Sequence, residues 1–408
     1  MTRAGSAPFH ELRAVIILAL GFGLVGVDRF LISTMFPTIA RDLGLDYSDI
    51  GTIAGALAIA WGLAALLMGN VADRLGPRRV LVGSLVLFSF LIGASGLATS
   101  LAGLIAVRVV MGLADGAFTP ASISATAAAS GPERMGRNIG LQQMTLPLFG
   151  LGFAPLVVAA LLHIVDWRYI FLIFALPGFA LAWATWRYLP GAPLVGDEHR
   201  DQARGGLRAD LAAVLAYPNI RRLMMLMLCW LTCLIITSAF MPSYLTDFLG
   251  LDTVSMGTVM SAIGFGSAAG AVVLAWASDL AGRRTVVLAC ALGAMISLVA
   301  LSRAPASAPL LFLALFCVHF FNTAAITLTV GPICAESVPA SLMATASGLI
   351  VATGELVGGG LGPIVAGHLA TRFGIEHLLW LPVAAMAVAL LLALGLRDGR
   401  ITNVEVSP

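Results

Sequence analysis

Twelve apolar stretches follow one another along this 408-residue chain, and each is long enough, at about 20 residues, to cross the ~30 Å core of a bilayer as a helix. Composition agrees, because charged residues make up only 11% of the chain, against about 25% in soluble proteins. We therefore expect an all-α membrane protein. The predicted spans are 14–39, 48–69, 79–98, 101–127, 138–163, 168–189, 220–247, 255–276, 285–303, 308–334, 343–370 and 378–397.

The longest polar connector, residues 191–219, divides these spans six and six. It predicts an N-terminal bundle of six helices at 1–190, a cytoplasmic linker at 191–219 and a C-terminal bundle of six helices at 220–408. Within the linker, residues 207–216 could form a short amphipathic helix on the membrane surface.

The basic residues predict the orientation of the chain. All 23 are Arg, and most fall in the connectors on the side of the two termini. Basic connectors stay in the cytoplasm, so both termini should be cytoplasmic. We expect a multi-pass protein of a bacterial inner (plasma) membrane, in contact with lipid and monomeric.

Several classes of function are disfavoured. The Arg clusters are short and the net charge is only +2, so we expect no nucleic acid partner. Without lysine there is no P-loop lysine or Schiff-base lysine. The five cysteines match no metal motif. We therefore expect that the protein is not an enzyme and binds no cofactor and no metal.

The two halves of the chain repeat one another at an offset of about 205 residues, read from the matching letters, as parallel transporter repeats do. Leu43-Gly44-Leu45-Asp46 recurs as Leu249-Gly250-Leu251-Asp252. Asp73, Arg78 and Arg79 recur as Asp279, Arg283 and Arg284. Parallel repeats predict two bundles with a solute site between them at mid-depth.

The repeated loop carries a resemblance. Gly69-x-x-x-Asp73-Arg74-x-Gly76-x-Arg78-Arg79 is similar to the signature between helices 2 and 3 of the major facilitator superfamily, and Asp279 with Arg283 and Arg284 forms a weaker copy. The resemblance implies the twelve-helix fold of that family, alternating access, and a gating role for both loops. The alternative is that these arginines only set the topology.

Five charged residues lie deep within the predicted spans, away from their ends: Asp28 and Arg29 in the first, Arg108 and Asp115 in the fourth, and Glu355 in the eleventh. Each would cost ~2.5–3.5 kcal/mol if it met lipid, so they should line a polar path. Arg108 and Asp115 share one helix face two turns apart. Gly112, between them, leaves room for a partner helix or a ligand.

Asp28-Arg29 and the string RVVMGLADGAFTPA around Arg108 and Asp115 resemble the anion:cation symporter branch of that superfamily, which moves organic anions, usually with protons. This chain has Asp115 where that branch usually has Glu. The resemblance implies Asp28 and Asp115 as proton carriers, Arg29 as the clamp on the substrate carboxylate, and Arg108 as the partner of Asp115. The chemistry suits these roles, because a guanidinium group matches a carboxylate and a nearby carboxyl group can take a proton.

Other polar residues in the spans are candidates with structural alternatives. Glu355 could be a further proton site, or a carboxylate bonded to its own helix. Gln142, Tyr244, His319 and Asn322 could contact substrate, or could only pack. The acid–base pairs could likewise only neutralise themselves and hold helices together. With three acids and two arginines, at least one acid must be neutral for an anion to be bound.

We therefore predict a secondary transporter for proton-coupled symport of a small organic anion. One alternative is a proton-driven exporter of drugs or other amphiphilic compounds, which the partial helix 5 pattern at 150–155 disfavours. The other is a ligand sensor that does not transport.

Overall fold

A computed structural model describes residues 8–75, 77–131, 133–189, 207–339 and 342–396, without the side chains of 8–10, 65–75 and 207–210. Within these ranges the chain is helical and has twelve helices long and apolar enough to span a membrane. The prediction of an all-α membrane protein is confirmed. Each observed span begins and ends within a few residues of the expected one, and the short helix α8 is Leu207–Ala216 as predicted.

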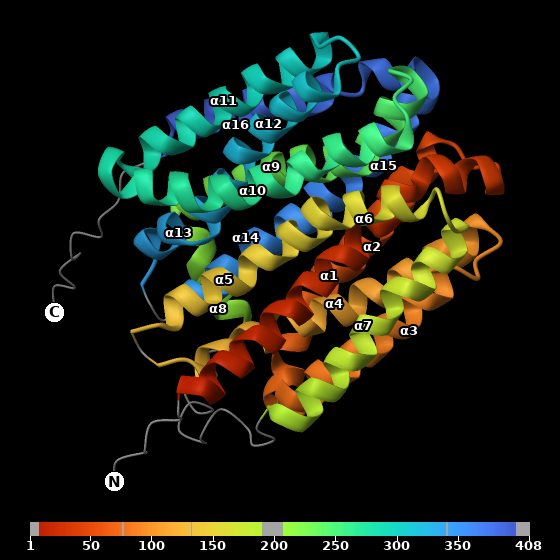
Figure 1. Cartoon of the computed structure of the whole chain (residues 1–408). Helices are drawn as coiled ribbons and strands as arrows, with labels where there is room; N and C mark the ends of the chain where they lie inside the picture. Colours follow the sequence, from red (N-terminus) through yellow and green to blue (C-terminus); the bar gives the residue numbers. More distant parts are fainter. Residues whose placement is uncertain (1–7, 76, 132, 190–206, 340–341, 397–408) are drawn as a thin grey trace, which may run out of the picture.

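The first six spans form one bundle, drawn from red to lime in Figure 1. They are α1 (Pro8–Leu43), α2 (Tyr47–Leu75), α3 (Pro77–Ser95), α4 (Leu101–Ala129), a composite span of α5 (Met135–Pro147), η1 (Leu148–Phe153) and α6 (Ala154–Leu161), and α7 (Trp167–Tyr188). Large apolar side chains on the outside, such as Phe90 and Leu176, remain more than half exposed, as expected for a surface that meets lipid.

The last six spans form the second bundle, drawn from green to blue. They are α9 (Pro218–Ser243) with η4 (Tyr244–Phe248), α10 (Thr253–Ala281), α11 (Arg283–Arg303), α12 (Ala308–Val330) with α13 (Pro332–Ser337), a composite span of α14 (Met343–Thr353), η6 (Gly354–Leu361) and α15 (Gly362–Phe373), and α16 (Trp380–Leu394) after the short η7 (Ile375–His377).

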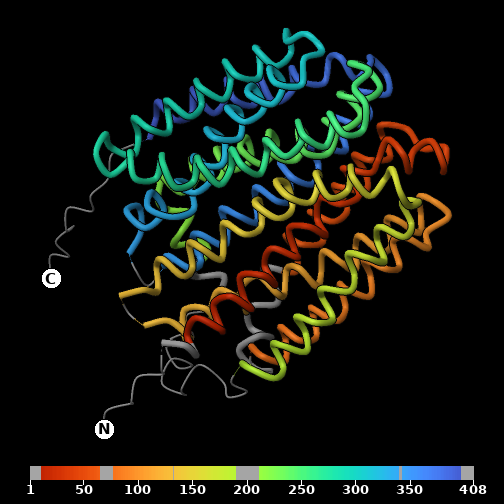
Figure 2. Tube along the Cα trace, viewed as in Figure 1, coloured from red at the N-terminus to blue at the C-terminus, as the bar shows by residue number. Residues whose placement is uncertain are grey.

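Glycines allow the two bundles to meet at close range. A Cβ at Gly264 of α10 would lie 2.1 Å from the backbone nitrogen of Gly152 in η1. A Cβ at Gly51 of α2 would lie 2.2 Å from the carbonyl oxygen of Pro363 in α15. Both approaches are too close for any larger residue. These helices are neighbours in the Cα trace of Figure 2: α10 lies beside α5 and α6, and α2 lies beside α15.

Polar contacts join the bundles at the end opposite the chain termini. The Tyr47 hydroxyl donates to Asp247 Oδ2 at 3.3 Å, and the Ser48 backbone N–H donates to the Thr371 hydroxyl at 3.0 Å. Arg41 lies 3.6 Å from Asp247. Together with the glycine contacts, these bonds close this end of the molecule.

Two of the composite spans contain a π-helical segment where the bundles meet. η1 brings Gly152 to the interface, where it meets Gly264, and η6 brings Glu355, Gly359 and Gly360. Such segments are rare and occur often at functional sites. In this protein they place the middle of the fifth and eleventh spans against the opposite bundle.

Candidate functional site at the bundle interface

The centre of the interface carries an ion pair between the bundles. Arg29 on α1 donates from Nη1 to Glu355 Oε1 at 3.0 Å and from Nη2 to Glu355 Oε2 at 2.7 Å. Both side chains are only 8% exposed. The Arg29 guanidinium also lies 4.5 Å from the centre of the Trp61 ring on α2. A planar guanidinium, bonded through two nitrogens and stacked on an aromatic ring, is held in a defined orientation.

A second pair lies within the first bundle. Arg108 on α4 donates from Nη1 to the backbone carbonyl of Asp28 at 2.8 Å, and the same nitrogen lies 3.5 Å from Asp28 Oδ1. Both side chains are buried. The structure gives Arg108 a direct contact with Asp28 and only an electrostatic one with Asp115, since seven helical residues separate the Cα atoms of Arg108 and Asp115 by about 10 Å along the axis. Asp28 comes closer from the neighbouring helix.

Asp115 is fully buried in α4. Neither of its carboxyl oxygens has a hydrogen-bond partner among the residues that the structure describes. It remains within electrostatic range of Asp28, Arg29 and Arg108. The space beside Gly112 is filled by a helix, since a Cβ there would lie 2.4 Å from the Leu57 carbonyl oxygen on α2.

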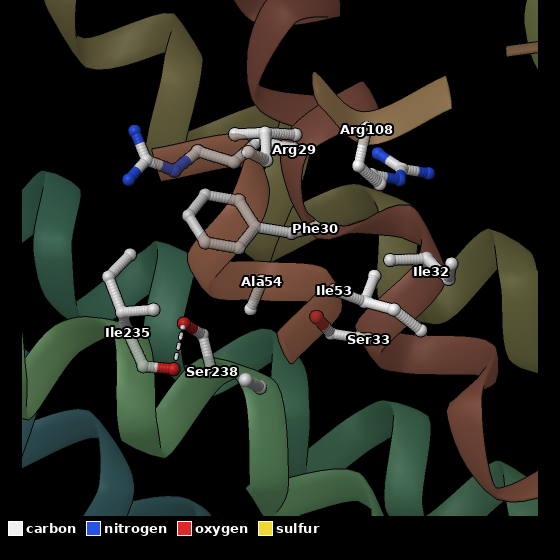
Figure 3. Close-up of a pocket in the computed structure, with 11 residues that line it drawn as sticks. Arg29, Phe30, Ile32, Ser33, Ile53, Ala54, Arg108, Ile235 and Ser238 are labelled. Atoms are coloured by element: carbon white, nitrogen blue, oxygen red, sulfur yellow. Dashed lines mark hydrogen bonds between the residues drawn. The ribbon is translucent and has the colours of Figure 1, made fainter. Parts of the chain in front are cut away.

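A small cavity opens between these charges and the second bundle (Figure 3). Arg29 and Arg108 lie at one side of it, and Ile235 and Ser238 of α9 lie at the other. Its volume is about 20 Å³, which is room for about one water molecule. The lining comprises Arg29, Phe30, Ile32, Ser33, Ile53, Ala54, Leu57, Arg108, Ile235, Ser238 and Ala239.

The structure places four other candidates away from this cavity. His319 Nε2 lies 3.0 Å from the Thr237 hydroxyl, and the Asn322 amide donates to the Trp230 carbonyl at 3.2 Å, so both face α9 inside the second bundle. Tyr244 is buried in η4 beside Phe248. Gln142 is buried in α5, and its amide has no hydrogen-bond partner among the described residues.

The loops expected to act in gating are only partly described. Arg283 lies 2.6 Å from Asp279 and 3.3 Å from Glu336, and Arg284 donates to the Leu394 carbonyl at 2.7 Å. In the first bundle Arg78 bonds the Trp186 carbonyl, and Arg79 is exposed. Gly76 lies outside the described residues. The surroundings of Gly69 and the side chains of Asp73 and Arg74 lie outside them as well.

Sequence reasoning missed the pairing of Arg29 with Glu355, which are 326 residues apart. It also missed the apolar lining from Phe30, Ile53 and Ile235. The only signal for the pair was the presence of an unpaired acid in the eleventh span. Nothing in the periodicity of either span identifies its partner.

Two repeated bundles of six spans with charged residues at their interface are typical of one class of protein, the secondary membrane transporters. The chain is a member of the major facilitator superfamily, whose family model matches residues 18–358 and 257–405. The predicted family and fold are therefore confirmed.

Known transporters align along nearly the whole chain. A Bacillus subtilis protein named as a candidate niacin/nicotinamide transporter is 26% identical, over 98% of this chain and 99% of its own length. A sialic acid transporter of Escherichia coli is 25% identical, over 97% of each chain. A 3-(3-hydroxy-phenyl)propionate transporter of Escherichia coli is 28% identical, over 90% of this chain and 89% of its own. The chain is thus a transporter of small organic solutes and not an enzyme.

Solved structures share the fold. A bacterial homologue of the human lysosomal transporter Spinster, inward-facing and occupied, superposes with a TM-score of 0.79 at 17% identity, over 96% of this chain and 97% of the other. A D-xylose–proton symporter superposes with a TM-score of 0.78 at 18% identity, over 95% and 98% of the two chains.

Proposed function

We propose that this protein is a secondary active transporter that couples uptake of a small organic anion to protons by alternating access. Two of the relatives are named as transporters of organic acids, sialic acid and 3-(3-hydroxy-phenyl)propionate. A third is named for niacin or nicotinamide. The central charges supply both ligands that such coupling requires, guanidinium groups for a carboxylate and carboxyl groups for protons. We place it in a bacterial inner membrane with cytoplasmic termini, as a monomer with bundles at 1–190 and 220–408 joined by 191–219.

The observation that carries the proposal is the ion pair between Arg29 and Glu355. In the closed centre, Glu355 makes with Arg29 the two parallel bonds that a substrate carboxylate would make. An incoming anion therefore replaces Glu355, which is released into a poorly solvated site. A carboxylate there is costly unless it takes a proton, so anion binding and proton binding favour each other.

Asp115 and Asp28 are the other proton carriers in this proposal. Asp115 is a candidate because it is buried and none of the described residues bonds to its carboxyl group, so a proton is the partner that would make its burial less costly. Protonation of Asp28 would loosen the hold of this residue on Arg108, whose positive charge then adds to the attraction for the anion. Gln142, Tyr244, His319 and Asn322 are candidate substrate contacts that would act only after the centre opens.

The test is transport in proteoliposomes with an imposed pH gradient. Carboxylate uptake should carry protons inward with the wild-type protein. Asp115→Asn should abolish proton-coupled accumulation but leave exchange of anion for anion. Arg29→Ala should remove anion binding. Proton movement in the opposite direction, driven by lipophilic cations, would instead indicate an exporter.

A control variant keeps the outcome clear. Asp166→Asn removes an acidic charge at the exposed start of α7, far from the centre, and asparagine can keep the bond from the Arg168 backbone N–H, so uptake and proton coupling should be unchanged. If Asp115→Asn also transports with full proton coupling, Asp115 is not a proton site and the proposal fails for that residue.

A further inference from the structure

The cavity that faces Arg29 is mainly apolar. Seven of its eleven lining residues are apolar, and the uncharged polar ones are two serines. The apolar residues are Phe30, Ile32, Ile53, Ala54, Leu57, Ile235 and Ala239. A buried hydroxyl group of a ligand needs hydrogen-bond partners, and without them each one lowers affinity. Such a lining accepts a solute with few hydroxyl groups.

The hydroxyl groups of α9 near the cavity already donate hydrogen bonds within the protein. The Ser238 hydroxyl bonds the Leu234 carbonyl at 2.6 Å, within its own helix. The next residue inward, Thr237, bonds the Cys233 carbonyl at 2.6 Å and contacts His319. The hydroxyl hydrogens of Ser238 and Thr237 are therefore used within the second bundle and are not available to a solute.

The charged groups allow one carboxylate. Arg108 is held by both the backbone carbonyl and the carboxylate of Asp28, inside one bundle. Arg29 is held by a residue of the opposite bundle, so separation of the bundles releases it. A second carboxylate on the same solute would have to share Arg108 with Asp28: the Nε and Nη2 atoms of Arg108 have no hydrogen-bond partner among the described residues, but its charge is already balanced by Asp28.

We infer that the substrate is a small monocarboxylate with a compact apolar body, of the size of benzoate, and not a polyhydroxylated acid. This inference rests on the proposed function. The carboxylate takes the place of Glu355 on Arg29, and the apolar body lies between Phe30 and Ile53 on one side and Ile235 on the other. Alternating access moves whole bundles, so the same facing side chains line the cavity as it widens to admit the solute.

The first experiment compares benzoate with gluconate, two monoanions at pH 7 that differ in their hydroxyl groups. Binding to the purified full-length protein is measured by isothermal titration calorimetry, and uptake is measured in proteoliposomes with a pH gradient. Benzoate should bind at least about tenfold more tightly than gluconate, because unmet hydroxyl groups cost affinity. Equal or tighter binding of gluconate would overturn the inference.

The second experiment changes the lining. Ile235→Thr keeps the branched shape and adds a hydroxyl group, which can donate to a carbonyl of its own helix, as Thr232 does, so the variant should fold. The new oxygen can still accept a hydrogen bond from a hydroxyl group of the solute. It should reduce the preference for benzoate over gluconate several-fold. Ile236→Thr is the matched control, since Ile236 is buried one position further along and does not line the cavity.

The outcomes separate the two proposals. Arg29-dependent, proton-coupled uptake of gluconate in preference to benzoate would leave the transport mechanism intact and overturn the substrate class. Binding of neither probe, or benzoate uptake without proton movement, would overturn the transport mechanism as well. An unchanged preference in Ile235→Thr would show that the apolar lining does not select the solute.

Discussion

The guanidinium group of Arg29 makes its two shortest contacts with a residue of the other bundle, and this decides what the unloaded protein can bind. An anion that approaches Arg29 competes with Glu355, which is tethered and always present. The apparent affinity for substrate is therefore lower than the affinity of Arg29 alone would give. In the proposed mechanism, selectivity would arise because only a solute with a well-placed carboxylate can complete the exchange.

Glu355→Gln tests this competition at the residue scale. Without the charge on Glu355, Arg29 is free for an anion, so binding of a carboxylate probe should tighten several-fold, while accumulation driven by a pH gradient should fall. The folded protein should also lose stability, because breaking a buried pair typically costs about 3–5 kcal/mol. Calorimetric binding, gradient-driven uptake and thermal unfolding measure the three effects.

Asp166→Asn provides the comparison, since Asp166 pairs with Arg168 in an exposed position at the start of α7. It should change none of the three measurements by more than a small amount. Weaker carboxylate binding in Glu355→Gln would mean that Glu355 assists the substrate and does not compete with it.

Which residues are charged inside the membrane could be predicted from the sequence, but their partners could not. The cost of a charge in lipid is enough to identify Asp28, Arg29, Arg108, Asp115 and Glu355 as inward-facing. Partnership depends on which helices meet and at what height, and that information is absent from any single span. Adjacent residues need not share a partner helix: Asp28 pairs with a residue of α4, and Arg29 pairs with a residue of η6.

At the scale of elements, the repeated Leu-Gly-Leu-Asp motif has a structural explanation. Gly44 and Gly250 end α1 and η4 with positive φ angles of 67° and 69°. Asp46 accepts from the Ser48 backbone N–H at 2.7 Å, and Asp252 accepts from the Ser255 backbone N–H at 2.9 Å. The bond from the Ser255 backbone N–H lowers the pKa of Asp252 below its usual value. Each half thus uses one glycine to end a helix and one aspartate to begin the next.

Gly250→Ala should therefore destabilise the protein through its backbone alone. A Cβ at Gly250 meets nothing within 4 Å, so no packing is lost, but the left-handed conformation costs an alanine about 1–2 kcal/mol. Thermal unfolding in detergent should show the loss, and Gly44→Ala should show a similar one.

Gly83→Ala is the control for this prediction. Gly83 lies within α3 and also has open space around it, so alanine should be neutral or stabilising by up to about 1 kcal/mol. Equal destabilisation at Gly83 and Gly250 would show that the conformation of the turn is not the cause.

At the scale of the molecule, one end is closed by backbone-to-backbone approaches that only glycine permits. Gly51 lies against the Pro363 carbonyl, and Gly367 lies against the Tyr47 carbonyl. Rocking of the bundles must separate these surfaces to admit solute from that side. The twelve spans could be predicted from the sequence, but the closed end could not, because it depends on how the two bundles are oriented relative to each other.

Gly51→Ala should open this end. The added methyl group would lie 2.2 Å from the Pro363 carbonyl oxygen, so the closed state loses stability relative to the state in which the bundles separate here. Spin labels at Ile164→Cys and Glu376→Cys, in a chain whose five native cysteines are replaced, would report the distance by pulsed electron resonance. The distribution should shift to longer distances in Gly51→Ala and remain unchanged in Gly83→Ala.

The pair formed by Arg29 and Glu355 also has an electrical consequence. A carrier that returns without cargo must take its binding residues through the membrane field, where each uncompensated charge feels the voltage. With Glu355 as a built-in counter-ion, the guanidinium group of Arg29 makes that journey as part of a neutral pair. The return step should then contribute little to the current, and membrane potential should act on the loaded protein more than on the empty one.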